Sequence, residues 1–596
     1  MTPSSLSDRA RGTEPMSRLR LNFLLALTLA LFASTRAHGE RPADRLLALV
    51  PPDAAATVAV EDLRGQAQKI SGSPLAQKLF ALAAVRQWMA SDRFRGLKAA
   101  TAQVEKALGG NLATVRDGLF GEAVVLTLRL PPGGRPDDAR GLLLLRVPDR
   151  PLLDRIIEGL NSASLRSGEL LRVSRRSRRE TPYFAREFAR GNRSDDYYAT
   201  LGAGVFAWSN SEDLIRGVID RQTTGAVGLS GVPAFEKVRK RLPERAAASL
   251  FVNPRFIEGL IVRSPRTGKP GEDRLLALLG RYVEAVRYAG AAVEWRNGVV
   301  LATEEELDPE KTSPALKRWA GRALGPRPDL VRFPQGVLMG ASADVDVATL
   351  YDLFDSLVDE RDRPKFENFA LSLRGILLGR DFRQEIAPRL GPGVSTYVER
   401  LNLADGDVRF PFVCSVQASG GAVADAADNA LRTLLAVHAL DSKHGGGRLR
   451  VESRRAVGAR VTVLNATSPF AYAVPDGRIV VGSTSGAVAR ALSAQADPAA
   501  GTGVERIRSL YFPDAMTFAF ADLKEIYAFA SPQRTLIARR MAAKQKRSQD
   551  DTARDLDQVL GFLGTFDAAF VSSVAEPDLS AVHHSIGVVK VPETRP

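Results

Sequence analysis

The stretch Tyr198–Val218, YATLGAGVFAWSNSEDLIRGV, decides how the chain is interpreted, because Tyr472–Leu492 repeats its pattern as YAVPDGRIVVGSTSGAVARAL. The two stretches align without a gap. The aligned pairs include Tyr198 with Tyr472, Ser209 with Ser483, Ser211 with Ser485 and Arg216 with Arg490. Each stretch has two short apolar runs separated by a turn, then a serine and a helical period. We therefore predict one unit twice: a β-hairpin that leads into a serine-capped helix.

Other segments recur in the same order around this pair. The predicted strands at 122–130 and 141–147 are matched by strands at 393–401 and 411–417. The displacement is near 260–275 residues, as it is between the two hairpins. Several weak similarities in one shared order predict a tandem duplication.

A second kind of echo links strand–helix segments. The phrase PDAAATVAVEDLR at 52–64 is similar to PDAMTFAFADLK at 513–524, and looser relatives lie at 247–255 and 336–346. Each has a β-branched or aromatic run followed by an Asp or Asn, which are residues that cap helices. We predict a strand that passes directly into a helix at each of these places.

Short turns between consecutive strands favour antiparallel pairing, and the amphipathic helices between them need an apolar surface to cover. The predicted fold class is α+β, with two tandem repeats, each a curved antiparallel sheet with helices packed mainly on one face. The repeats are placed at 42–320 and 335–593. The linker is placed at 321–334, where Gly, Pro and Arg accumulate.

The N-terminus has the features of an export signal at residues 1–37. Arg18 and Arg20 precede the apolar run LNFLLALTLALF at 21–32, and small residues follow it up to His38. Because a membrane span takes about 20 apolar residues, we predict a cleaved signal peptide, with an uncleaved N-terminal anchor as the alternative. No other run is long and apolar enough, so the mature chain is predicted to be periplasmic or extracellular without a transmembrane span.

Composition indicates a folded globular protein, since 45% of the residues are hydrophobic and 25% are charged. The 596 residues can bury a large core. Cys414 is the only cysteine, so no internal disulfide is possible, and its apolar neighbours favour a packing role.

No catalytic, cofactor or metal site is predicted. The glycines of Gly202–Ala207 formally match a dinucleotide motif, but they precede a strand instead of opening a helix. The phrase Gly482–Gly486, GSTSG, resembles a nucleophile elbow with Thr484 at its centre, yet a helix cap explains it more simply. His583 and His584 are neighbours in a predicted strand and so face opposite sides. The acidic run Glu304–Glu306 is interpreted as a solvated strand end, with weak cation binding as the alternative.

Basic charge is the remaining signal, with a formal net charge of +14. The densest run is Arg172–Arg179, RVSRRSRR, and the candidate polyanion-binding residues are Arg175, Arg176, Arg178 and Arg179. Such clusters attract phosphates and other anions. For an exported protein the expected partner is an anionic envelope polymer or lipid headgroups, and no nucleic acid is expected. The alternative is a solvated arginine-rich surface.

The PDA…DL[RK] segments, the twice-written hairpin and phrases such as VEDLRG and FAWSNSEDLI resemble a family of exported bacterial proteins of unknown function. The resemblance implies export and a repeated α+β layout, and it implies no activity. The leading hypothesis is a non-enzymatic extracytoplasmic binding or scaffold protein of the cell envelope. The alternative is an envelope hydrolase with a carboxylate-based site between the two halves, or one that uses Thr484.

Overall fold

The computed structural model describes residues 41–590, apart from single positions and short gaps. The longer gaps are 106–110, 132–137, 190–193, 255–279, 322–332, 401–410, 442–449, 466–469, 497–507 and 509–513. The predicted signal peptide and nearly all of the predicted linker therefore lie outside the described residues.

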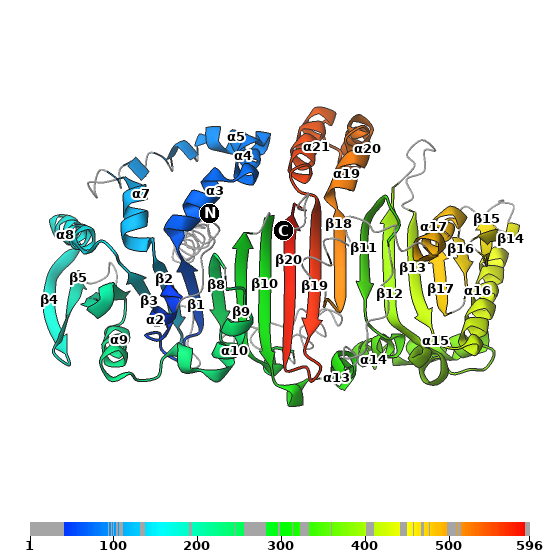
Figure 1. The fold of residues 1–596 in the computed structure, drawn as a ribbon, viewed down its shortest axis with the longest axis horizontal. Helices are drawn as coiled ribbons and strands as arrows, with labels where there is room; N and C mark the ends of the chain where they lie inside the picture. Colours follow the sequence, from blue (N-terminus) through cyan, green and yellow to red (C-terminus); the bar gives the residue numbers. More distant parts are fainter. Residues whose placement is uncertain are drawn as a thin grey trace, which may run out of the picture.

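Within the described residues, twenty strands form the body of the protein. Those of the first half are β1 (Ala56–Glu61), β2 (Ala123–Arg129), β3 (Arg140–Arg146), β4 (Leu170–Arg178), β5 (Thr181–Phe188), β6 (Asp196–Leu201), β7 (Val205–Ser209), β8 (Ala248–Val252), β9 (Val286–Trp295) and β10 (Gly298–Leu307). Those of the second half are β11 (Val337–Ala343), β12 (Leu390–Glu399), β13 (Phe412–Ala418), β14 (Arg450–Ala456), β15 (Ala459–Asn465), β16 (Phe470–Ala473), β17 (Arg478–Gly482), β18 (Thr517–Asp522), β19 (Ala568–Ala575) and β20 (Ala581–Val589). All their pairings are antiparallel, and together they make one sheet (Figure 1).

The two halves of the sheet have the same strand order. In the first half the neighbours follow the order β4-β5-β6-β7-β3-β2-β1-β8-β9-β10. In the second half they follow the order β14-β15-β16-β17-β13-β12-β11-β18-β19-β20. The halves meet where β10 pairs with β20, from Gly298 opposite Val589 to Glu306 opposite Ala581. The fold is thus α+β with one continuous sheet, not two separate sheets.

The four strand–helix segments predicted from sequence similarity lie at the middle of each half. β1 is the neighbour of β8, and β11 is the neighbour of β18. Asp62, Asp346 and Asp522 each cap the helix that follows the strand, accepting a hydrogen bond from a backbone N–H three residues on. The predicted capping role is confirmed at these three aspartates.

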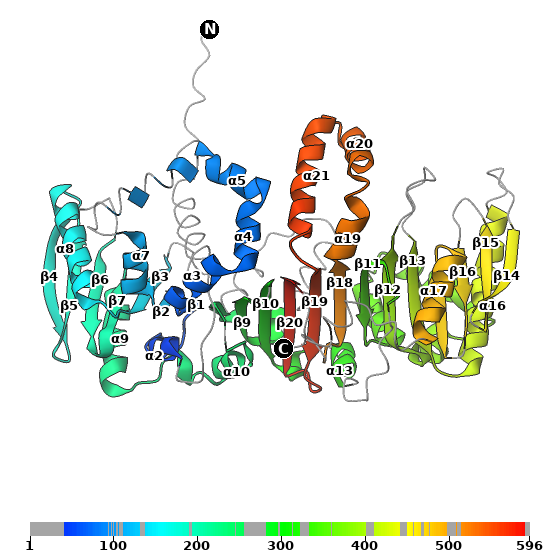
Figure 2. The same cartoon turned by 45° about the horizontal axis from the view of Figure 1, so that its top comes forward.

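Helices begin at the ends of many strands. They include α2 (Pro42–Leu47), α3 (Leu63–Gly72), α4 (Pro74–Ala81), α5 (Ala83–Ala90), α7 (Leu112–Val115), α8 (Arg150–Arg166), α9 (Glu212–Thr224), α10 (Pro233–Arg241), α13 (Pro314–Gly321), α14 (Val347–Leu357), α15 (Arg363–Ile376), α16 (Gly421–Asp441), α17 (Ser485–Ala496), α19 (Leu523–Ala530), α20 (Arg534–Gln545) and α21 (Gln549–Leu563). The helices α20 and α21 are separate because Lys546, which ends α20, is left-handed with a φ of 54°. Figure 2 shows α3–α5 and α19–α21 as two arms that rise from the strand ends. The arms touch where the Gln558 amide donates to Gln87 Oε1 at 3.5 Å.

Helices cover both faces of the sheet, so the expectation of helices mainly on one face is wrong. On β3, Leu142 and Leu144 belong to a core with α2 and α9. Leu143 and Leu145 face the other way, toward α8. The physical reason is visible in the run GLLLLRV at 141–147, since an unbroken apolar run is typical of a strand buried on both faces.

Candidate binding surfaces

One row of side chains crosses fourteen strands on a single face of the sheet. From β7 to β17 the directly opposed residues are Phe206, Leu145, Val124, Val60, Ala248, Val293, Leu301, Ile586, Val571, Ala519, Ala341, Thr396, Cys414 and Val481. Opposed residues on paired strands point to the same side of a sheet. All but Thr396 are apolar or, in the case of Cys414, weakly polar, so this face needs cover along its whole length.

Helices provide that cover at both ends of the row. Leu145 and Phe206 are buried in a cluster that includes Leu153 and Ile156 of α8. At the other end Val481 packs against the cluster around α16. Nearer the middle, Leu63 of α3 packs with Val60 and Ala248.

The centre of the row is different. We call the middle of this face the central face and define it by two adjacent rows on β9, β10, β20, β19, β18 and β11. The rows are Val293, Leu301, Ile586, Val571, Ala519 and Ala341, and Trp295, Val299, Val588, Ala569, Ala521 and Met339. Neither row contains a charged residue. Ile586 is 47% exposed, Met339 46%, Val571 43% and Leu301 37%, so large apolar side chains at the middle of the sheet face solvent.

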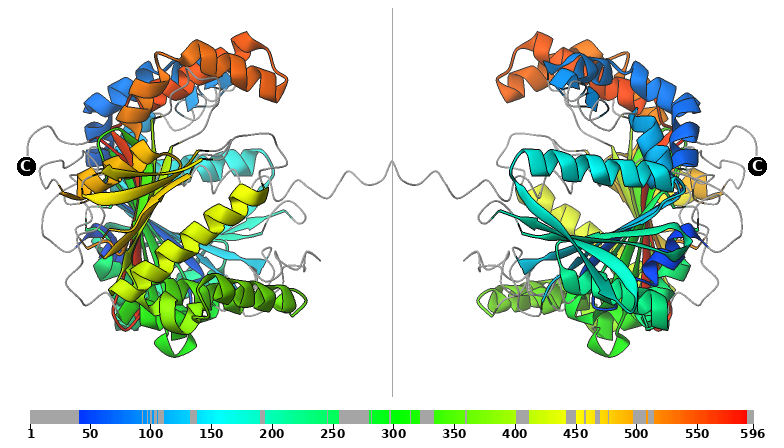
Figure 3. Two further views of the ribbon diagram at one scale, coloured as in Figure 1. Left: turned by 90° about the vertical axis from the view of Figure 1, so that its right-hand side faces the viewer. Right: turned by 90° about the vertical axis from the view of Figure 1, so that its left-hand side faces the viewer.

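The central face has helices around it. Figure 3, which views the sheet from its two ends, shows α8, α16 and the arm of α20 and α21 on the same side of the sheet. The arms meet through α5 and α21, as the Gln87–Gln558 contact shows. Within the described part of the chain, the central face therefore keeps exposed apolar side chains, and helices on the same side of the sheet surround it.

The opposite face of the β10–β20 junction holds buried acids. Glu304 and Glu306 are each 2% exposed. Lys237 Nζ and Arg241 Nη1 of α10 donate to Glu306, and His583 Nδ1 lies 3.0 Å from Glu304 Oε2. The interpretation of Glu304–Glu306 as a solvated strand end is wrong for these two residues. Alternation in the strand puts them under α10, where burial requires such ion pairs.

His584 faces the other way, as its position in a strand predicts. Its Nδ1 lies 2.7 Å from Ser573 Oγ on β19, on the side of the central face. Burial lowers the pKa of His584, with the neighbouring Glu305 acting in the opposite direction. His583 and His584 are therefore held in two separate hydrogen-bonded environments.

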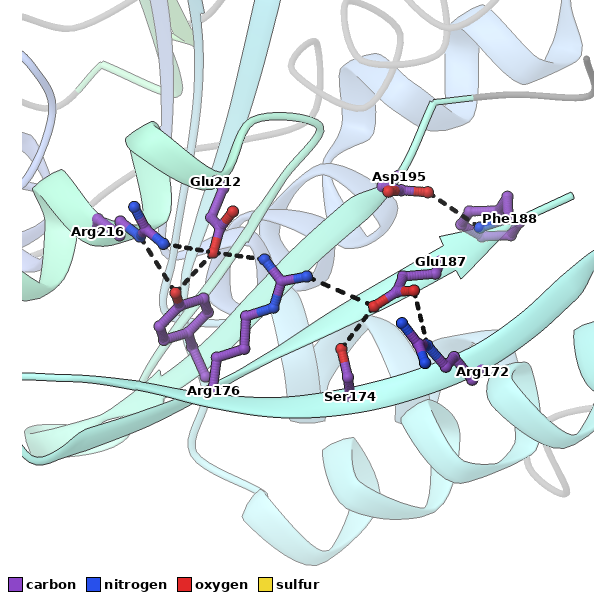
Figure 4. Close-up of polar contacts among 9 residues, drawn as sticks. Arg172, Ser174, Arg176, Glu187, Phe188, Asp195, Glu212 and Arg216 are labelled. Carbon is purple, nitrogen blue, oxygen red and sulfur yellow. Dashed lines mark hydrogen bonds and ion pairs between the residues drawn. The ribbon is translucent and has the colours of Figure 1, made fainter. Parts of the chain in front are cut away.

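The arginine run lies mainly on β4, where the structure adds acidic partners (Figure 4). Arg176 bridges Glu212 of α9 at 2.7 Å and Glu187 of β5 at 3.5 Å. Arg172 donates to Glu187 at 2.7 Å, and this bond lowers the pKa of Glu187. Arg216 joins the same network through Glu212.

At the turn after β4, Arg178 and Arg179 share one acid. Both donate to Asp220 of α9, Arg178 through two nitrogens at 3.0 and 2.8 Å and Arg179 at 2.7 Å. These bonds lower the pKa of Asp220 to about 2. Arg175 is exposed on the same strand. Three of the four candidate polyanion-binding residues are therefore partly neutralised within the protein.

The twice-written stretch forms β6, β7 and α9 in the first half and β16, β17 and α17 in the second. Its tyrosines both reach a helix on the central-face side: Tyr198 OH lies 3.4 Å from Asn161 Nδ2 of α8, and Tyr472 OH donates to Asp428 of α16 at 2.9 Å. The residues at 202–204 form the predicted turn between β6 and β7.

The predicted serine caps need correction. Ser211 holds the N-cap position of α9 without a side-chain cap bond, and its own N–H donates to Ser209 Oγ. In the second copy Thr484 Oγ1 accepts from the Ala487 N–H, so the cap is Thr484 and not Ser485. This bond gives Thr484 a structural role as the cap of α17.

Two further searches concern the described residues alone. No group of three or more His, Cys, Asp or Glu side chains in the described part of the chain is arranged to hold a metal ion. None of the helices described above is both long and apolar enough to cross a membrane. Comparisons with protein families, curated proteins and solved structures found no match for this chain.

Proposed function

We propose that the protein is a non-enzymatic extracytoplasmic binding protein of the cell envelope, exported by its N-terminal signal, and that its binding surface is the central face. The observation that carries this proposal is the pair of uncharged rows on β9, β10, β20, β19, β18 and β11, which contain side chains up to 47% exposed. Contiguous exposed apolar surface on a soluble protein marks a place where something binds.

The energetics favour a bound partner over a bare surface. Covering apolar area stabilises a complex by about 25 cal/mol per Å². Leu301, Ile586 and Val571 are direct neighbours across three strands, so one ligand can cover all three together. An apolar ligand in this place would replace the helix cover that the same row has at its ends.

The alternative, a hydrolase with carboxylates between the halves, is less well supported. Glu304 and Glu306 do lie at the junction of the halves, but Lys237 and Arg241 donate to Glu306, and Arg241 and His583 lie 3.5 and 3.0 Å from Glu304. Buried acids that are fully engaged in ion pairs are typical of structural networks.

We also propose that the two halves, 42–320 and 335–593, arose by tandem duplication. The support is the identical order of ten strands in each half and the equivalent placement of the twice-written stretch. β10 and β20 hold the same position in their halves, so the junction joins equivalent strands.

A secondary anion-binding role for Arg175, Arg176, Arg178 and Arg179 remains part of the proposal. The support for this role is the position of the four arginines on an exposed strand and turn. The ion pairs with Glu187, Glu212 and Asp220 weaken the case, because they partly neutralise the positive charge. Removing all four charges should weaken salt-sensitive binding to anionic liposomes or envelope polymers. Unchanged binding would rule the role out.

The central face can be tested with an apolar fluorescent probe. The chain beginning at His38 should bind N-phenyl-1-naphthylamine, and Ile586→Asp should weaken this binding at least tenfold because a carboxylate cannot be covered by an apolar group without a partner. Val227→Asp is the matched control, since Val227 is 67% exposed but lies outside the central face. Equal binding by the wild-type protein and the Ile586 variant would refute the proposal.

A further inference from the structure

We infer that the two helical arms, α3–α5 and α19–α21, form a gate that opens and closes one border of the central face. This inference rests on the proposed function and adds how a ligand reaches that surface. Three features of the arms support it: where they start, how they are joined, and which side chains lie exposed beside their contact.

The arms start on opposite sides of the strands that make the middle of the central face. One arm follows β1 and the other follows β18, and β8, β9, β10, β20 and β19 lie between these two strands. At about 4.8 Å per strand the two starting points are about 29 Å apart. Figure 2 shows the arms rising next to each other above these strands, with α4 and α5 beside α21. One arm from each half therefore reaches across the junction of the halves.

The arms are joined by a small contact. The Gln558 amide donates to Gln87 Oε1 at 3.5 Å, and this bond is exposed to solvent. A Cβ on Gly561 would lie 3.5 Å from Leu82 Cδ2, so α21 meets Leu82 at a residue that has no side chain. An exposed hydrogen bond between two amides stabilises a contact only slightly, because water offers each amide a similar bond. Joined and separated arms therefore differ little in free energy.

Apolar side chains beside the contact are open to solvent. Trp88 follows Gln87 and is 54% exposed, and Val559 follows Gln558 and is 53% exposed. A closer approach of the arms would remove part of this surface from water, which favours the joined form. Elements with exposed hydrogen bonds and few buried contacts also open more readily than a packed core. The two arms thus have the properties expected of a part that moves.

A gate at this border would control how fast a ligand enters and leaves, and would leave its affinity unchanged. Gln87, Gln558 and Gly561 lie on the arms, and none of them belongs to the two rows of the central face. Joining the arms therefore changes the path to the apolar rows without changing the rows themselves.

Locking the arms together tests this inference. The variant Gln87→Cys/Gln558→Cys is made in a Cys414→Ser chain that begins at His38. Because the two glutamines meet end to end, a short bis-maleimide is used to link the cysteines. In stopped-flow mixing with N-phenyl-1-naphthylamine, association and dissociation should each slow about tenfold or more, with a dissociation constant unchanged within about twofold. Amide hydrogen exchange should slow in α4, α5 and α21 of the same sample. The single variants Gln87→Cys and Gln558→Cys, treated with the same reagent, are the matched controls and should keep the rates of the untreated chain.

Pushing the arms apart should have the opposite effect. Gly561→Trp places a ring against Leu82 and should speed association about threefold or more, again with an unchanged dissociation constant. Gly159→Trp in α8 is the matched control, since nothing lies within 4 Å of a Cβ at that position. It should leave the rate unchanged.

The outcomes separate the gate from the proposed function. If the linked chain binds and releases the probe at the rates of the single variants, the gate is overturned while the proposed function stands. A link that changes the dissociation constant and leaves the rates of the two forms in step with it would place the arms in the binding surface and overturn the gate too. If the unmodified chain does not bind the probe, the proposed function fails, and hydrogen exchange alone decides about the arms. Exchange that is unchanged by the link would then overturn their movement, and slower exchange would support it.

Discussion

The centre and the ends of one sheet face carry the same kind of side chain but differ in what covers them. Phe206 near one end is 2% exposed beneath α8, whereas Ile586, seven strands further along the same row, is 47% exposed. Since side-chain chemistry is the same, the difference lies in the helices. The ends are covered by α8 and α16, whereas the described part of the chain leaves Ile586 at the centre about half exposed.

The largest expected difference in the free energy of unfolding comes from replacing Phe206 or Ile586 by aspartate. Phe206→Asp should lower the free energy of unfolding by at least about 4 kcal/mol, because it removes a buried ring and buries a carboxylate. Ile586→Asp should change it by less than about 1 kcal/mol, as is usual for exposed sites. Urea denaturation followed by circular dichroism measures both. A large loss at Ile586 would show that the centre is covered after all.

Shortening one apolar side chain in the covered region and one on the central face should have a smaller effect than adding a charge. Leu153→Ala in α8 should cost about 2–4 kcal/mol, because Leu153 is 2% exposed and its loss leaves a cavity. Val571→Ala on the central face should cost less than about 1 kcal/mol. Similar losses in the urea midpoint for the two variants would contradict the comparison.

The two covered ends can be compared through their tyrosines. Tyr472→Phe removes a 2.9 Å bond to the Asp428 carboxylate and should cost about 1–2 kcal/mol. Tyr198→Phe removes only the 3.4 Å contact with Asn161 and should cost about 0.5 kcal/mol or less. Thermal unfolding of both variants tests this order, and an Asp428→Ala background should abolish the larger effect.

The smallest effect on stability is expected at Asp220 of α9, which accepts hydrogen bonds from Arg178 and Arg179 at the edge of the sheet. The pKa of Asp220 is depressed to about 2 in the folded protein, so its contribution is present above about pH 4 and is lost as the pH falls toward 2. Solvent screening limits it to less than about 1 kcal/mol. The stability difference between wild type and Asp220→Asn should therefore shrink over this pH range. A difference that is unchanged at pH 2 would contradict the assignment.

Local patterns in the sequence predicted most of the elements. The strands at 122–130 and 141–147 form the paired β2 and β3, and Asp62 and Asp522 cap the helices that follow their strands. Turn residues, β-branched runs and caps act within a few positions of one another, which is why a single sequence reveals them.

These local patterns could not predict which strands pair when they are far apart in the sequence. The contact of β10 with β20 joins residues almost 300 positions apart, and the burial of Glu304 and Glu306 follows from it together with α10. The central face was missed for the same reason, since its rows take residues from both halves. One signal was available in the strand at 580–590, where Val582, Ile586 and Val588 alternate with small or polar residues, which indicates two distinct faces.

The junction of β10 with β20 also determines which strands remain at the margins of the sheet. Within the described residues β4 pairs only with β5, and β14 pairs only with β15. Both marginal strands are rich in arginine, as RVSRRSR in β4 and RVESRRA in β14. Unpaired strand margins invite addition of further chains and growth into fibres, and charged side chains oppose it. The arginines at both margins are therefore expected to oppose the addition of further strands to the ends of the described sheet.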